Sequence, residues 1–291
     1  MGDSAMLKQL LNLPESVTDQ RLREICDDFD ATVYPKVRVA DVLPIEKSGI
    51  DNEQYRYALQ AHFDFVVADS KAHPLFVVEF DGSSHSEPDA KRRDRLKNAL
   101  WERFNVPILR INRRYLSDKF SDWDLLRWFA TVFFVKRSWD EDVESGRIPP
   151  EDSVFDPAFV SVRTKSGYLG LDLERGAWAE FGRLSQAQKI PWHIPNWITA
   201  RDTEGVLRAI AWMPVSNDEA VVAETAMHPH NLGDWVQFAV RGIVLTHLMK
   251  NLTQVLEGKD VARPREEIVG RAREFESAHT VIMAFGLVEP K

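Results

Sequence analysis

The segment Val77–His85 places the strongest constraint on what this chain can fold into. It reads Val-Val-Glu-Phe-Asp-Gly-Ser-Ser-His, an apolar run that ends in two carboxylates, a glycine and a histidine. Valine and phenylalanine favour a strand, and glycine favours a turn directly after it. Acidic residues are seldom buried without partners. The segment therefore predicts a polar site where a buried strand ends.

A second apolar strand precedes this one, at His62–Val67. The polar, proline-closed stretch between the two strands predicts a turn, and hence an antiparallel hairpin. If Ala68 faces Leu75 across this hairpin, counting outward places Asp64 opposite Glu79. The two acids are then expected to be neighbours.

Because side chains alternate along a strand, Asp64, Glu79 and Asp81 are expected to share one face. The opposite, core face would carry Phe63, Phe65, Phe76, Val78 and Phe80. Like charges that face each other across a ladder repel, and a hard cation bound through oxygens removes the repulsion. We therefore expect Mg²⁺ or Mn²⁺ here. In the alternative, the acids form a chance strand end that points into solvent or caps the next helix.

A basic helix is expected after the strand. Ser86 suits an N-cap, Pro88 suits the first turn, and the pattern continues to Phe104. Its polar face holds five cations, Lys91, Arg92, Arg93, Arg95 and Lys97. Lys97, with Arg93 one turn before it, is expected to lean over the carboxylates. The other three suit an ordinary solvated face.

Together these motifs resemble the PD-(D/E)XK nuclease superfamily. Within it, they are similar to the branch of very-short-patch-repair-like endonucleases and domain-of-unknown-function family 2726. The resemblance covers residues 16–135, and the segment 34–43 also resembles the opening of family 2726. It implies a restriction-endonuclease-like α/β fold, a mixed sheet flanked by helices in the order α-β-β-β-α-β-α. The motifs that carry it are Asp64, Glu79–Gly82, His85, Asp94–Lys97 and Pro107–Ile111.

The resemblance implies a catalytic set of Asp64, Glu79, Asp81, His85 and Lys97. Asp64 and Glu79 would be metal ligands, and Asp81 a third ligand or a supporting acid. The superfamily usually has a lysine two residues after the acid, where this chain has Asp81. Lys97 would replace that lysine from the helix, and His85 would position the attacking water or protonate the leaving oxygen.

Other charged residues are expected near the substrate. Arg93, Lys97, Arg113 and Arg114 would contact nucleic acid; alternatively, Arg113 and Arg114 merely face solvent. Relatives often take another acid from the first helix, for which Glu24 is the candidate. Glu24 also fits an ordinary solvated glutamate.

Two functions compete for this chain. The resemblance implies a Mg²⁺-dependent phosphodiesterase acting on nucleic acid, DNA in the first place, as an endonuclease in a defence or repair setting of bacteria or phages. The loss of the usual lysine leaves the alternative of an inactive nuclease fold that binds nucleic acid or a protein partner. A metal-dependent hydrolase of another phosphoester also remains open.

The composition indicates the compartment and the partners to expect for this protein. The formal net charge is −8, which argues against indiscriminate coating of nucleic acid, but residues 82–119 carry seven Arg and three Lys against five acids. The single cysteine excludes an internal disulfide and suits a reducing compartment. No signal peptide or apolar run long enough to span a bilayer is visible. We expect a soluble, cytoplasmic protein with no membrane partner.

A length of 291 residues predicts two domains. We expect a nuclease-like domain at 1–143, with an irregular loop at 44–60, a linker at 144–153, and a smaller α+β domain at 154–291 that ends in a helix at 265–285. This second domain would select the target or a protein partner. Its tryptophans are expected in the core, or alternatively as stacking surfaces for bases: Trp178, Trp192, Trp197, Trp212 and Trp235.

Overall fold

The computed structural model describes residues 9–80, 88–165, 167–191 and 194–286, and the chain divides into two compact units. The first unit comprises residues 1–118 and 124–134, and the second comprises residues 119–123 and 135–291. The sequence predicted a boundary at 144–153. In the structure the division falls inside helix α6, Leu125–Glu144, and a 3-10 turn, Pro150–Asp152, occupies part of the expected linker.

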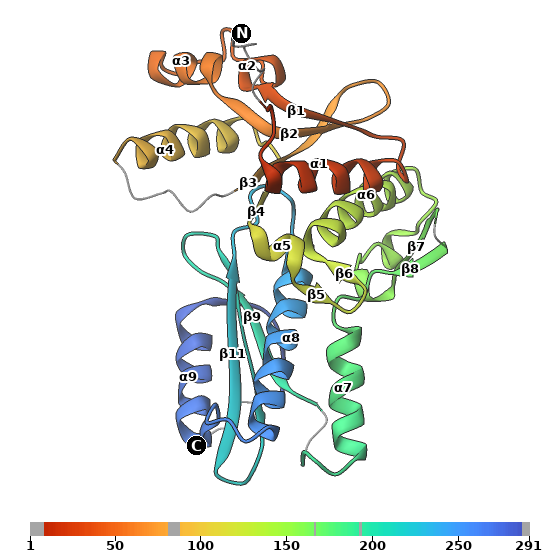
Figure 1. The fold of residues 1–291 in the computed structure, drawn as a ribbon, viewed down its shortest axis with the longest axis vertical. Helices are drawn as coiled ribbons and strands as arrows, with labels where there is room; N and C mark the ends of the chain where they lie inside the picture. The colour runs from red at the N-terminus through yellow and green to blue at the C-terminus, as the bar shows by residue number, and fades with distance from the viewer. Residues whose placement is uncertain (1–8, 81–87, 166, 192–193, 287–291) are drawn as a thin grey trace, which may run out of the picture. The chain divides into compact units, whose positions relative to one another are not determined.

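The first unit is built on a four-stranded mixed sheet in the order β1-β2-β3-β4 (Figure 1). Its strands are β1 Thr32–Arg38, β2 His62–Ala68, β3 Pro74–Phe80 and β4 Ile108–Ile111. The first three strands pair antiparallel, whereas β3 and β4 are parallel and are joined through helix α4, Pro88–Arg103. The predicted mixed sheet flanked by helices is confirmed.

The β2–β3 hairpin has the register expected from the sequence along most of its length. Phe65 pairs with Val78, and Val67 pairs with Phe76. One further step in the same register places Asp64 opposite Glu79. The end near the turn differs, because Ala68 pairs with Pro74 rather than Leu75 across a register shift. The register shift is confined to the turn end of the hairpin, so the end that carries Asp64 and Glu79 keeps the expected register.

Helices cover both faces of this sheet. On one face, the ring of Phe76 packs at a tilt against that of Phe133 of α6, with ring centroids 4.6 Å apart. Helix α1, Leu13–Cys26, lies beside α6, and Phe29 just after it stacks on Phe134 (Figure 1). The other face packs against α2, Val39–Val42, α3, Asn52–Gln60, and α4, through a cluster that includes Val66, Val77, Leu100, Trp101 and Ile108.

Phe63 does not lie on the face predicted for it. It stacks on Trp101 of α4 at 4.6 Å and belongs to the cluster with Val66 and Val77. Strand pairing with β1 is interrupted just beyond it, because no pair forms between Pro35–Phe65 and Val37–Phe63, and Lys36 has a left-handed φ of 53°. The strict alternation of faces therefore fails at this position.

The predicted irregular loop at 44–60 is also corrected. Its second half is helix α3, which begins at a capping box: the Asp51 side chain accepts from the backbone of Gln54, whose side chain is bonded to the Asp51 N–H. After β4 a short helix, α5, spans Arg113–Ser117. Two-residue strands β5, Lys119–Phe120, and β6, Trp123–Asp124, form a separate ribbon before α6.

The second unit is the larger of the two, not the smaller, and it too is rich in sheet. Its main sheet has the order β12-β11-β10-β9-β13, with every described pair antiparallel. The strands are β9 Asn196–Arg201, β10 Leu207–Pro214, β11 Glu219–Met227, β12 Arg263–Pro264 and β13 Thr280–Phe285. Two further strands, β7 Ser161–Thr164 and β8 Gly167–Gly170, form an isolated ribbon after a 3-10 turn at Pro157–Phe159.

Three helices complete the second unit: α7 Arg175–Gln186, α8 Val236–Leu256 and α9 Arg265–Ala278. Helices α8 and α9 lie on opposite sides of the sheet (Figure 1). The predicted terminal helix ends at Ala278, because Thr280 begins a strand rich in β-branched residues. Trp197, Trp212 and Trp235 are buried, as expected for core tryptophans, whereas Trp178 is partly buried and Trp192 lies outside the described residues. Among the described residues, no helix combines the length and apolar composition needed to cross a membrane.

The stack of Phe63 on Trp101 predicts a large effect on stability. Phe63 is fully buried, so Phe63→Ala should lower the free energy of unfolding by about 3–5 kcal/mol through lost transfer energy and a cavity. Urea unfolding followed by tryptophan fluorescence measures this. Leu59→Ala, at a position 41 % exposed on α3, should change it by less than about 0.5 kcal/mol. Equal effects of the two substitutions would contradict the packing described here.

Candidate functional site

A row of four charged residues crosses the sheet of the first unit, one from each strand. Pairs on either side of them put Lys36 opposite Asp64, the hairpin register puts Asp64 opposite Glu79, and Glu79 pairs directly with Arg110. The order across the sheet is thus cation, carboxylate, carboxylate, cation. Cross-strand neighbours lie about 5 Å apart, so each acid faces one like and one opposite charge.

Asp64 is held on both carboxylate oxygens. Its Oδ2 accepts a hydrogen bond of 2.9 Å from the backbone N–H of Phe80, directly after Glu79 on β3. Its Oδ1 accepts from the Lys36 ammonium at 2.7 Å. The first contact ties β2 to the end of β3, and the second ties it to β1. The position of this acid is therefore fixed by both neighbouring strands.

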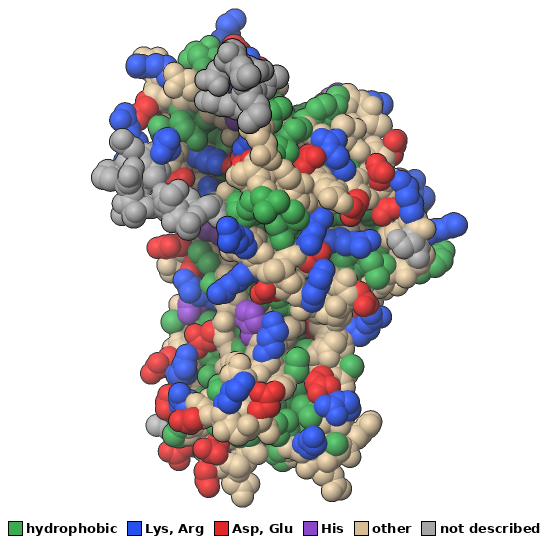
Figure 2. All heavy atoms as spheres, viewed as in Figure 1, with side chains coloured by type: hydrophobic (Ala, Val, Ile, Leu, Met, Phe, Trp, Pro, Cys, Tyr) green, Lys and Arg blue, Asp and Glu red, His purple; other side chains and the backbone are tan. Residues whose placement is uncertain are grey.

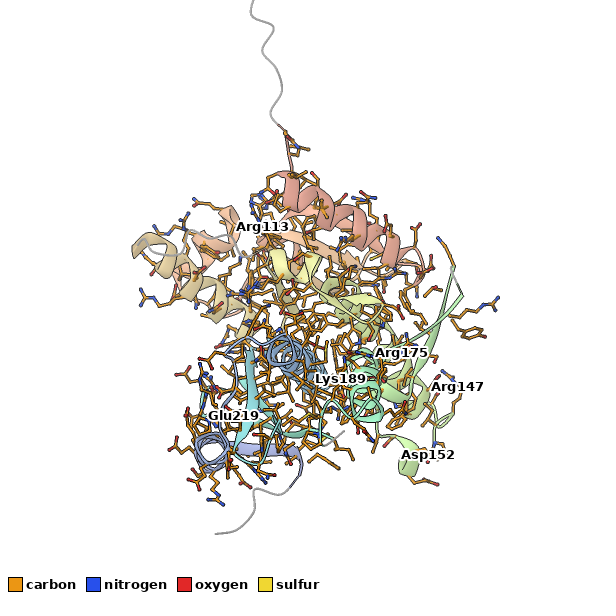
Figure 3. The ribbon with its side chains drawn as sticks, turned by 60° about the horizontal axis from the view of Figure 1, so that its bottom comes forward. Arg113, Arg147, Asp152, Arg175, Lys189 and Glu219 are labelled. Atoms are coloured by element: carbon orange, nitrogen blue, oxygen red, sulfur yellow. The ribbon has the colours of Figure 1, made fainter. Side chains whose placement is uncertain are left out.

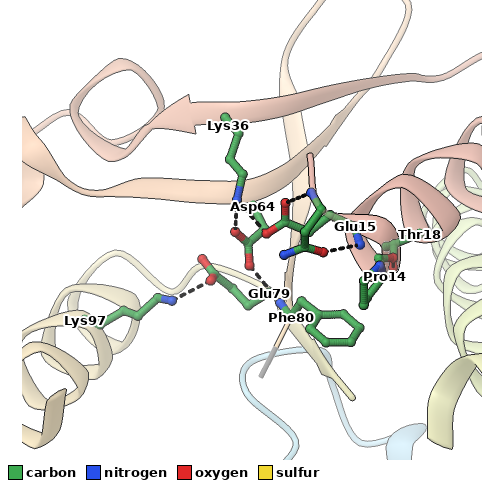
Figure 4. Close-up of polar contacts among 9 residues, drawn as sticks. Pro14, Glu15, Thr18, Lys36, Asp64, Glu79, Phe80 and Lys97 are labelled. Carbon is green, nitrogen blue, oxygen red and sulfur yellow. Dashed lines mark hydrogen bonds and ion pairs between the residues drawn. The ribbon is translucent and has the colours of Figure 1, made fainter. Parts of the chain in front are cut away.

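Lys36 joins two carboxylates from different elements (Figure 4). Its Nζ lies 2.7 Å from Asp64 Oδ1 and 2.9 Å from Glu15 Oε1 on α1. Burial opposes the charge, but the carboxylates of Asp64 and Glu15 outweigh it and raise the pKa of Lys36 above its ordinary value. Sequence reasoning missed both Lys36 and Glu15. Its candidate acid from the first helix, Glu24, is exposed and accepts from Gln20, which agrees with the alternative of an ordinary solvated glutamate.

Glu79 is a buried carboxylate, with only 3 % of its surface exposed. Its Oε2 accepts from the ammonium of Lys97, which reaches it from α4 as the sequence predicted. Burial raises the pKa of Glu79 to about 7; Lys97 opposes the rise, and the Asp64 charge adds to it. Burial raises the pKa of Tyr57 on α3 to about 12, and the Glu79 carboxylate adds to this rise.

The second oxygen of Glu79 has no hydrogen-bond partner in the described part of the chain. Among the buried side-chain atoms of the described residues, Glu79 Oε1 and Arg110 Nε are two that make no hydrogen bond. The Arg110 guanidinium instead donates to Asn98 Oδ1 on α4 at 2.5 Å. An unsatisfied buried carboxylate oxygen is costly, by about 1–3 kcal/mol or more. Such an atom beside a second carboxylate fits a cation ligand.

The described residues of this site supply some of the ligands that a divalent ion needs. Asp64 and Glu79 supply hard oxygen donors of the kind that Mg²⁺ and Mn²⁺ prefer, and the free Glu79 Oε1 is available to one. Within the described ranges, however, no group of three or more His, Cys, Asp or Glu side chains is placed to hold a metal ion. The predicted ligand Asp81 and the predicted catalytic His85 lie outside the described residues.

The remaining predicted contacts to nucleic acid lie on the surface. Arg93 is an exposed residue of α4, and Arg114 is exposed on α5. Arg113, the first residue of α5, is exposed as well (Figure 3). The structure brings Asp64, Glu79 and Lys97 together, and it adds Lys36, Glu15 and Arg110. A count along β1 in register with β2 would have found Lys36 from sequence, and a count along β4 would have found Arg110.

Comparison with known proteins gives one match. The model of a family described as protein of unknown function (DUF2726) matches residues 7–121. This segment contains all four strands of the first sheet and every residue of the site described above. No curated protein and no solved structure matches the chain. The first unit is thus similar to an uncharacterised family domain.

The left-handed backbone of Lys36 allows the effect of backbone strain on stability to be measured separately from the effect of the lysine charge. A left-handed φ costs an L-residue about 1 kcal/mol that glycine does not pay. Lys36→Gly should therefore unfold with a free energy about 1 kcal/mol higher than Lys36→Ala, although both lose the ammonium. Chemical denaturation of the two variants measures the difference. An alanine variant as stable as the glycine variant would contradict the observed φ of 53°.

Glu79 predicts a pH-dependent stability. Its pKa of about 7 in the folded chain lies above the ordinary value of 4.5, so the folded state holds the proton more tightly than the unfolded state. The free energy of unfolding should fall as pH rises between these two values, by up to about 3 kcal/mol. Glu79→Gln, which cannot ionise, should become more stable relative to the parent at pH 8 than at pH 5, to about this extent.

The matched control is Glu102→Gln, at an exposed position of α4. Its stability difference from the parent should not change across the same pH range. Urea titrations of the three proteins at both pH values test this. If the Glu79 and Glu102 variants respond alike, ionisation of Glu79 is not the cause.

Proposed function

We propose that the first unit is a metal-dependent nuclease that hydrolyses phosphodiester bonds, with DNA rather than RNA as its substrate. It would cut as an endonuclease. The observation that carries the proposal is the unpartnered Oε1 of a buried Glu79, set beside Asp64 while Lys97 occupies the other oxygen. A carboxylate pair with one oxygen kept out of hydrogen bonds suits a site for Mg²⁺ or Mn²⁺. Resemblance of the surrounding motifs to the PD-(D/E)XK superfamily supports the same reaction.

In this proposal Asp64 and Glu79 hold the ion. When bound, it would supply a water of lowered pKa and offset negative charge on the phosphate. Lys97 fixes the orientation of Glu79 through Oε2 and adds a positive charge beside the reacting phosphate. Phe80 fixes Asp64 through its N–H. Asp81 and His85 would complete the ligand set and the proton transfers.

Lys36 gives the site a second lysine. Because its ammonium has Glu15 as well as Asp64 for an acceptor, it can keep one ion pair when Asp64 takes a metal ion. Together with Lys97 and Arg110, it places positive charge on both sides of the two central acids. Exposed Arg93, Arg113 and Arg114 would extend this cationic surface along a nucleic-acid backbone.

One observation favours a second function. Each central acid already has a lysine within the chain, Lys36 for Asp64 and Lys97 for Glu79. Two such pairs hold the carboxylates together without a metal ion. The alternative proposal is therefore a nuclease fold that binds nucleic acid or a protein partner and does not cut.

Cleavage assays distinguish the two proposals. The full-length chain is incubated with labelled single- and double-stranded DNA and RNA, with Mg²⁺, Mn²⁺ or a chelator. We expect cutting that requires the metal. Glu79→Ala should lose both Mn²⁺ binding, measured by calorimetry, and cutting. Lys97→Ala should keep Mn²⁺ binding and lose cutting by about 100-fold or more, because it removes charge from the reacting phosphate.

Lys71→Ala is the matched control, since Lys71 is an exposed lysine in the turn between β2 and β3. This variant should cut and bind Mn²⁺ like the parent. Undiminished cutting by Glu79→Ala would show that the site is assigned wrongly. Metal binding without cutting of any substrate would favour the non-cleaving function.

A further inference from the structure

The β7–β8 ribbon of the second unit presents two unusually exposed aromatic side chains. Phe159, at the end of the 3-10 turn before β7, is 89 % exposed, and Tyr168 on β8 is 79 % exposed. They are the most exposed aromatic residues in the described part of the chain. Single apolar residues on a surface are normal, but two large rings on one small ribbon mark a contact surface.

Tyr168 and Arg163 lie on the same face of the ribbon. Arg163 pairs with Tyr168 and Ser161 pairs with Gly170, so these four residues share one face. Phe159 ends the 3-10 turn that leads into β7 through the extended Val160. The face therefore carries an aromatic ring, a cation and two small residues, and a second exposed ring precedes it in the chain.

The ribbon is held in a defined conformation. The Trp123 indole N–H donates to the carbonyl of Gly170 at 3.0 Å, and the Leu171 N–H donates to the carbonyl of Val160 at 2.9 Å. At the turn, the Thr164 hydroxyl donates to the carbonyl of Gly167 at 3.0 Å. The exposed rings are therefore carried on an ordered backbone, which lowers the entropic cost of binding a ligand.

The charge of this ribbon points to an anionic ligand. Residues 157–171 contain Arg163 and Lys165 and no acid, within a chain whose net charge is −8. Arg163 is exposed, and no acidic side chain of the described chain pairs with it. Figure 2 shows basic and apolar side chains next to one another on the surface that the ribbon forms.

We propose that the β7–β8 ribbon binds single-stranded nucleic acid, with unpaired bases stacked on Tyr168 and Phe159 and Arg163 against the backbone phosphates. Aromatic faces beside cations suit single strands, because the base faces of a duplex are already stacked on one another. An apolar peptide would match the rings but not the exposed Arg163 guanidinium, which pairs with no acid in the described part of the chain. This inference rests on the proposed function in taking nucleic acid as the partner, and it names unpaired strands as the form that the second unit recognises.

The test uses the full-length chain with Glu79→Gln as background and chelator present, so that no probe is cut. Fluorescence anisotropy measures binding to labelled DNA and RNA strands of about 16 nucleotides and to the matching duplexes. Tyr168→Ala and Phe159→Ala should each weaken single-strand binding about tenfold, whereas Tyr168→Trp should retain it. Arg163→Ala should also lower the slope of log affinity against log salt by about 0.7.

Two controls match these changes. Leu256→Ala removes an apolar side chain, 42 % exposed, at the end of α8, and Lys189→Ala removes an exposed cation after α7 (Figure 3). Neither should alter binding, and circular dichroism checks that each variant is folded. Undiminished binding by a Tyr168→Ala, Phe159→Ala double variant would overturn the proposal. So would a parent protein that binds no single strand, or that binds duplexes more tightly.

The outcomes separate this inference from the proposed function. If the ribbon variants lose single-strand binding and the parent chain shows no metal-dependent cutting, the ribbon inference is supported and the nuclease proposal is rejected. If the parent chain cuts with metal and the ribbon variants bind and cut as it does, the nuclease proposal is supported and the ribbon inference is rejected. A protein partner captured through Tyr168 in place of a nucleic acid would also overturn the inference.

Discussion

The burial of the Glu79 carboxylate determines how the first unit is put together. A charge removed from water costs several kcal/mol unless a partner compensates it, and Lys97 on α4 is that partner. Leu100 and Trp101, the next turn of α4, pack on the same face of the sheet. The ion pair and the apolar contacts therefore fix the same helix in the same place, and loss of either partner would leave a buried charge alone.

A second ion pair repeats this arrangement one strand away. Lys36 holds Asp64 and Glu15, so α1, β1 and β2 are joined at one ammonium. Strain at a lysine with positive φ persists only where the surroundings determine it, and here two carboxylates do. The two pairs differ in one respect: Asp64 is bonded on both oxygens, whereas Oε1 of Glu79 accepts no hydrogen bond from any described residue. Of the two central acids, Glu79 is therefore the one with an oxygen available to a ligand.

Simple counting predicted much of this from the sequence, because strand alternation and hairpin register depend on local pattern. The Asp64–Glu79 juxtaposition and the reach of Lys97 were obtained in this way. Lys36 was missed because β1 was not counted in register with β2. Phe63 was placed on the wrong face because side-chain type does not encode the left-handed φ of Lys36 on the neighbouring strand. Helix α3 was missed although Asp51 and Gln54 form a recognisable capping box. The last helix was extended through Thr280, where β-branched residues favour the strand that the structure has.

The positive and negative charges of the described site cancel, and this determines which ligands the site attracts. Lys36, Lys97 and Arg110 supply three positive charges, and Glu15, Asp64 and Glu79 supply three negative charges when all are ionised. The group is then neutral, so the two adjacent acids are compensated by cations of the chain itself. A divalent cation at Glu79 Oε1 would raise its charge to about +2, and phosphodiesters carry one negative charge each. The metal-bound group would therefore attract a nucleic-acid backbone that the neutral group has little electrostatic reason to bind.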